Sequence, residues 1–97
     1  MVRLLWTSSM RKHRVTRRHV RHVIDHAGLI FVQPAPSGSP LGDHRLIYLG
    51  DDETGAALEI MAVEVEDDNG DALMVIHAMA LREKYRAEYE EARRWRR

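Results

Sequence analysis

The sequence contains no cysteine. This absence excludes a disulfide framework, a thiolate nucleophile and every zinc site built on cysteine ligands. Aromatic residues are scarce, at 6% of the chain, and include a single phenylalanine. No hydrophobic run approaches the roughly 20 residues that a membrane-spanning helix needs. We therefore expect a cytoplasmic protein that does not use a membrane.

The chain also lacks net charge, with 15 basic and 15 acidic residues, but these charges are unevenly distributed along the sequence. Residues 1–27 hold seven Lys/Arg and one acid, residues 51–76 hold nine Asp/Glu and no Lys/Arg, and residues 82–97 hold seven Lys/Arg and four Glu. The basic ends would suit contact with RNA or with an acidic partner. The alternative is that these segments neutralise one another within the fold.

The remaining composition is that of a small folded protein. Hydrophobic residues make up 44% of the 97 residues and charged residues 31%, which is typical of a soluble domain rather than a disordered chain. A chain of this length fits one domain, so we expect a single domain over residues 1–97.

Apolar residues recur at helical spacing in two segments, one in each half of the chain. Apolar residues at 20, 23, 24 and 27 form one helical face, with Thr16 as a suitable N-cap and Gly28 as a suitable stop. A second stripe runs through residues 81, 85, 89 and 92, within a predicted helix over residues 80–97.

Four strands are predicted between the helices, over residues 29–33, 44–50, 57–67 and 72–78. "DDETG" forms one turn, with Gly55 suited to a positive φ, and Asn69-Gly70 forms a tight hairpin loop. The expected fold is therefore α+β. It has one or more N-terminal helices, an antiparallel sheet of about four strands, and a C-terminal helix packed on one face.

The hairpin register predicts where His77 lies. If Asn69 and Gly70 form the loop, His77 stands opposite Ala62, on the less apolar face and near Glu64. If the preceding loop has four residues, Arg45 also faces Ala62, and the three residues form a row across three strands. The alternative interpretation is that His77 only caps a strand end and that Arg45 pairs with a nearby carboxylate.

Three segments of this sequence resemble BrnT-type toxins, which belong to the RelE-like group of bacterial ribonuclease toxins. They are "RKHRVT", "RLIYLG" and "VIHAMALREKYRAEYEEA". Members of that family typically carry "KHGV" before a helix, an "RYxxxG" strand, and "ISAR" followed by a helix ending in "YEE". The last block aligns without a gap from residue 76 to residue 91. The chain departs from the pattern at three positions, where the family serine, arginine and glycine are His77, Met79 and Arg14.

The resemblance implies metal-independent cleavage of RNA by attack of a 2′-hydroxyl on the adjacent phosphate. Such a reaction needs a general base, a general acid and cations at the phosphate. We assign His77 as base or acid and Arg45 as the phosphate clamp, with Arg82 as a supporting cation in place of the missing family arginine. Further RNA contacts are expected from Arg11, Lys12, His13, Tyr85 and Tyr89. The alternatives are that both tyrosines belong to the core and that Lys12 and His13 are surface charges.

The same resemblance implies partners and no cofactor. We expect a cognate antitoxin protein, RNA that includes ribosome-bound mRNA, and either a homo-oligomer or a toxin–antitoxin hetero-oligomer. The competing hypothesis is a non-catalytic small domain that binds RNA or protein, an inactive relative of the toxins.

Three histidines of the first helix, His19, His22 and His26, suggest a metal site, because His22 and His26 stand at i, i+4 spacing. However, Arg18 and Arg21 flank them and would repel a cation. We therefore interpret the histidines as a solvated helix face and expect no metal.

Overall fold

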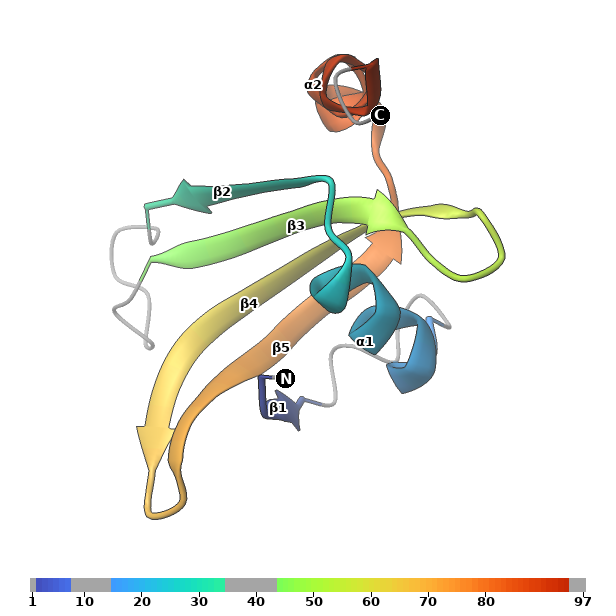
Figure 1. Ribbon diagram of the computed structural model, residues 1–97. Helices are drawn as coiled ribbons and strands as arrows, with labels where there is room; N and C mark the ends of the chain where they lie inside the picture. The colour runs from blue at the N-terminus through green and yellow to red at the C-terminus, as the bar shows by residue number, and fades with distance from the viewer. Residues whose placement is uncertain (1, 8–14, 35–43, 95–97) are drawn as a thin grey trace.

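The computed structural model describes residues 2–7, 15–34 and 44–94 (Figure 1). In this part of the chain it contains five strands and two helices, which confirms the α+β class. In chain order they are β1 (Leu4–Trp6), α1 (Arg17–Asp25), β2 (Leu29–Gln33), β3 (Arg45–Asp51), β4 (Ala57–Asp67), β5 (Gly70–Ala80) and α2 (Glu83–Arg94). Neither helix is long and apolar enough to cross a bilayer.

The strands form one sheet in the order β1-β5-β4-β3-β2. Strands β2 to β5 are antiparallel to their neighbours, whereas β1 runs parallel to β5. The prediction of a four-stranded antiparallel sheet, preceded only by helices, is therefore wrong in its details. Strand β1 has only three residues, too few for alternation to reveal a strand. Its place depends on long-range contacts, among them the hydrogen bond that Leu73 N donates to Arg3 O at 2.9 Å.

The two helices lie on opposite faces of this sheet (Figure 1). Helix α1 packs on one face through Val20, Val23 and Ile24, which contact a core that includes Ile60 and Val75. Helix α2 packs on the other face through two buried tyrosines and is joined there by Ile47 and Leu49 of β3. Each helix thus buries one apolar stripe against alternate residues of the same strands.

Helix α1 begins as the sequence predicts and ends earlier. The Thr16 hydroxyl accepts a hydrogen bond from His19 N at 3.2 Å, so Thr16 is the N-cap. The helix ends at Asp25 rather than near Gly28, and Gly28 does not adopt a positive φ. Instead, Gly28 N donates to Leu49 O at 3.0 Å, and this bond attaches the chain after α1 to β3.

The β4–β5 hairpin is confirmed, but its loop is Asp68–Asn69, one residue earlier than predicted. Gly70 has a φ of 101° and pairs with Asp67. From the loop as far as Ala62, the shift moves each predicted pair by two residues along β5, and a shift of two keeps each residue on its face.

A β-bulge then changes the faces. Ala62 pairs with Val75, but the next residue of β4, Met61, pairs with His77, so that Ile76 is the extra residue of β5. As a result Val75 and Ala78 both enter the core beneath α1, and His77 lies on the opposite face. The predicted pairing of His77 with Ala62 is therefore wrong because of the loop shift, which pairs Ala62 with Val75. The bulge, which simple alternation does not reveal, then pairs His77 with Met61 on the opposite face.

Gly50 of β3 lies close to Val23 of α1 and to the chain that follows this helix, and this contact can be tested. A Cβ atom at Gly50 would lie 3.3 Å from Val23 Cγ1 and 3.4 Å from the backbone Cα of Ala27. We predict that Gly50→Ala lowers the free energy of unfolding by about 1–3 kcal/mol, because the helix must move away from the sheet. Chemical denaturation measures the change, and an unchanged stability would contradict this packing.

Candidate functional site

Arg45 and His77 lie on the same face of the sheet. In register, Ile47 pairs with Met61 and Met61 pairs with His77, so these three side chains share the face opposite α1. Residues alternate along a strand, which places Arg45 on the same face as Ile47. The predicted row through Ala62 is wrong, because Ala62 pairs with Leu46 and is buried beneath α1.

The two residues are separated by one intervening strand, β4. The spacing between strands puts their backbones about 10 Å apart across the sheet, with an additional offset along it. Both side chains are half-buried. Glu64, the predicted neighbour of His77, is on the other face, since it pairs with Leu73 of the α1 core. The side chain that does contact the imidazole Nε2 is the Met79 sulfur.

Arg82 is held in an ion pair at the start of α2. Its Nε and Nη2 donate to Glu59 Oε2 at 2.9 and 2.6 Å, and its backbone N donates to Glu59 Oε1 at 2.8 Å. The Glu59 side chain is only 3% exposed. The carboxylate also raises the pKa of Arg82, mainly through the side-chain hydrogen bond. Arg82 therefore anchors α2 to β4, and this position does not favour its predicted role as a supporting cation for RNA.

The two tyrosines are core residues, as the alternative interpretation held. Tyr89 is 1% exposed and its hydroxyl donates to Asp51, and Tyr85 is 8% exposed and packs against Phe31 with ring centroids 5.4 Å apart. Rings that are packed in this way favour the core interpretation over the predicted stacking on RNA bases. The other predicted RNA contacts, Arg11, Lys12 and His13, lie outside the described residues.

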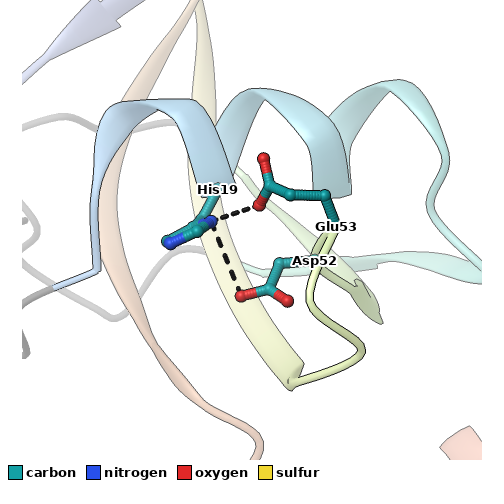
Figure 2. Close-up of side chains that lie close together, drawn as sticks. All are labelled: His19, Asp52 and Glu53. Carbon is teal, nitrogen blue, oxygen red and sulfur yellow. Dashed lines mark hydrogen bonds and ion pairs between the residues drawn. The ribbon is translucent and has the colours of Figure 1, made fainter.

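A second cluster of polar side chains lies on the α1 side of the molecule (Figure 2). His19, in the first turn of α1, faces Asp52 and Glu53, in the turn between β3 and β4. His19 Nδ1 donates a hydrogen bond to Glu53 Oε1 and lies 3.6 Å from Asp52 Oδ2. The Asp52 side chain is 6% exposed, whereas those of His19 and Glu53 are 29% and 27% exposed. The cluster is thus buried on one side and accessible on the other.

The β3–β4 turn holds Asp52 in a fixed orientation. Its Oδ1 accepts hydrogen bonds from Thr54 N, Thr54 Oγ1 and Ala56 N at 2.8, 2.6 and 3.0 Å. Gly55 has the positive φ that the sequence predicts, at 90°. Because Oδ1 faces the turn, Oδ2 is the oxygen that faces His19.

Both carboxyl groups of the cluster are acidified. The hydrogen bond from Thr54 is the main cause that lowers the pKa of Asp52, and the hydrogen bond from His19 is the main cause that lowers the pKa of Glu53. Both groups are therefore ionised at neutral pH. The arrangement can orient the His19 imidazole for proton transfer, or present one nitrogen and two anionic oxygens to a cation.

Sequence reasoning identified His19 but not its partners. Asp52 and Glu53 are 33 and 34 residues away, and "DDETG" was interpreted only as a turn. The other two histidines of α1 behave differently, because the His22 and His26 rings stack on each other with centroids 4.4 Å apart. The cluster forms because α1 packs beside the β3–β4 turn, a contact that no sequence motif encodes.

No protein-family model matches this chain, and no curated protein matches it in sequence.

The ion pair of Arg82 gives a test of its structural role. We predict that Arg82→Met destabilises the protein by about 2–4 kcal/mol, because the buried Glu59 carboxylate loses its partner, with a discount for the partly exposed guanidinium. Arg86→Met is the matched control on the same helix, since Arg86 pairs with the exposed Glu83 and Glu90. The control should change the free energy of unfolding by no more than about 0.5 kcal/mol. Equal effects of the two variants in urea denaturation would contradict this assignment.

The lowered pKa values of Asp52 and Glu53 predict acid sensitivity. A carboxyl group whose pKa is lower in the folded state stabilises the fold above its ordinary value, here 3.8 for Asp and 4.5 for Glu, and this stabilisation disappears as the pH falls through the lowered pKa. The free energy of unfolding should therefore decrease on acidification from about pH 5 to about pH 3. Glu53→Gln should reduce the slope of that decrease, and an identical slope in wild type and variant would show that Glu53 does not contribute.

Proposed function

We propose that this protein is a metal-independent endoribonuclease of the toxin type, with the sheet face that carries Arg45 and His77 as its site. The observation that carries the proposal is that an imidazole and a guanidinium, both half-buried, lie on one face of the sheet opposite α1. The resemblance of three segments to BrnT-type toxins supports the same activity and a RelE-like arrangement of the fold.

The chemistry follows from the two side chains. An imidazole can accept or donate a proton near neutral pH, so His77 would remove the proton from the attacking 2′-hydroxyl or protonate the leaving 5′-oxygen. A guanidinium fork matches phosphate oxygens, so Arg45 would stabilise the charge that develops on the phosphorane. An RNA backbone that crosses the sheet between β3 and β5 would contact both groups.

Met79 occupies the position of the family arginine, and the structure puts its sulfur against the His77 ring. The two residues are two apart on β5, so their side chains share a face. A cation at position 79 would therefore stand beside the imidazole. Since methionine carries no charge, the proposal assigns phosphate stabilisation to Arg45.

The roles of the remaining residues are revised accordingly. Arg82, Tyr85 and Tyr89 support the site through the packing of α2 rather than through contact with RNA. The proposed setting is the cytoplasm, the proposed substrate is mRNA, and the proposed partner is an antitoxin that covers the site.

Induced expression in a bacterial host tests this function. We predict that the wild-type chain arrests growth and fragments RNA, whereas His77→Ala and Arg45→Ala do neither. The cleavage rate of the purified protein should fall about 10²–10⁴-fold in His77→Ala and about 10²–10³-fold in Arg45→Ala, with chelator present throughout. The matched controls are His26→Ala and Arg86→Ala, which remove an imidazole and a guanidinium from exposed positions of the helices.

The outcomes separate the candidate functions. RNA binding that Arg45→Ala weakens, without cleavage by the wild type, would favour the non-catalytic binding domain. Equal cleavage by wild type and both site variants would contradict the assignment of the site.

The position of Met79 gives a second test. If the loss of the family arginine has reduced activity, Met79→Arg should increase the cleavage rate, and this increase should depend on His77. The measurement is cleavage by Met79→Arg with and without His77→Ala. An increase that survives the loss of His77 would place the active group elsewhere.

A further inference from the structure

We propose that His19, Asp52 and Glu53 bind one divalent transition-metal ion of the zinc class. The residues come from the first turn of α1 and from the β3–β4 turn, and Figure 2 shows their side chains directed toward one another. This site is independent of the proposed ribonuclease face, which lies on the other side of the sheet.

The ligand atoms are already close to the spacing that a metal ion requires. One nitrogen of His19 and one oxygen from each carboxylate lie within 4.8 Å of one another, and His19 Nδ1 is 3.6 Å from Asp52 Oδ2. Ligand bonds to zinc of about 2.0–2.2 Å in a tetrahedron separate neighbouring ligands by about 3.4 Å. His19 Nδ1 now donates to Glu53 Oε1, so binding would move the imidazole proton to Nε2 and side-chain rotations would separate these two atoms to the ligand spacing. The three side chains would then form a three-ligand site, and water would occupy the remaining position.

Hydrogen bonds fix the Asp52 carboxylate before any ion binds. Its Oδ1 accepts three hydrogen bonds from its own turn, and the backbone N of His19 is hydrogen-bonded to the N-cap hydroxyl of Thr16, which holds the first turn of α1. Oδ2 thus remains oriented toward His19. Binding costs less when ligands need not be ordered, so this rigidity favours a specific ion over a loose association.

The charges also favour a cation. Asp52 and Glu53 contribute two negative charges, and the nearest counter-charge is Arg18, whose Nε lies 3.4 Å from Glu53 Oε2. The Arg18 contact uses the carboxylate oxygen that does not face His19, and its side chain is 85% exposed, so it can turn into solvent. A neutral imidazole and two carboxylates form a ligand set that zinc accepts.

The sequence offered a different pair, His22 and His26, which we interpreted as part of a solvated helix face with no metal. Their rings stack, and His26 Nδ1 is bonded to His22 O, so this pair is not arranged as two converging ligands. In this protein the His22–His26 pair is thus less suited to an ion than the three residues that the fold brings together.

Isothermal titration of the untagged, full-length chain with Zn²⁺ alone tests the proposal. We expect one ion per chain, with affinity at least about 10-fold lower in His19→Ala and in Glu53→Gln. His22→Ala, the matched histidine control, should bind as the wild type does. Arg18→Ala should bind more tightly, because it removes a competing positive charge; a purely structural ion pair would not produce that result.

Two results would overturn the proposal. One is the absence of saturable zinc binding to the wild-type chain, with circular dichroism showing that it is folded. The other is binding that His22→Ala abolishes and His19→Ala leaves unchanged. Neither result bears on RNA cleavage, which is measured in chelator and depends on Arg45 and His77.

Discussion

One extra residue in β5 determines which side chains share a face of the sheet. Because Ile76 is bulged, Val75 and Ala78 both face α1, and His77 is directed to the opposite side. Without the bulge, His77 would enter the core beneath α1, and an imidazole there would require a buried polar partner. The apolar core on one face and the polar pair on the other thus depend on the same local irregularity.

Helix α2 packs on that same face of the sheet, and the buried carboxylate of Glu59 determines where this helix begins. Glu59 lies in β4, and its carboxylate binds both the side chain and the backbone N of Arg82. Immediately after it, Tyr85 and Tyr89 fill the space between α2 and β3. The ion pair and the tyrosines therefore hold α2 on the face that also carries Arg45 and His77.

Local patterns in the sequence predicted most of the fold. The N-cap at Thr16, the turn at Gly55 and the β4–β5 hairpin are encoded by short-range chemistry, and all three are present. Strand β1 was missed because three residues form a strand only when β5 is beside them. The bulge was missed because an alternating pattern offers no signal for an inserted residue.

The candidate sites likewise include residues that the sequence identified and contacts that only the tertiary structure creates. The sequence named Arg45 and His77, and the fold does place them on one face, although through a different register from the predicted one. It assigned Arg82 to RNA in place of the missing family arginine, whereas the buried Glu59 carboxylate accounts for the position of Arg82. His19 acquires its partners only when α1 packs beside the β3–β4 turn, a contact that depends on the tertiary structure.

The most direct measurement of the central claim is the chemistry of the RNA ends that the purified protein produces in the presence of chelator. Attack by the 2′-hydroxyl, with His77 moving the proton, predicts a 2′,3′-cyclic phosphate or 3′-phosphate on one fragment and a 5′-hydroxyl on the other. Fragments with a 5′-phosphate and a 3′-hydroxyl, or cleavage that appears only when the chelator is omitted and metal is added, would contradict the account.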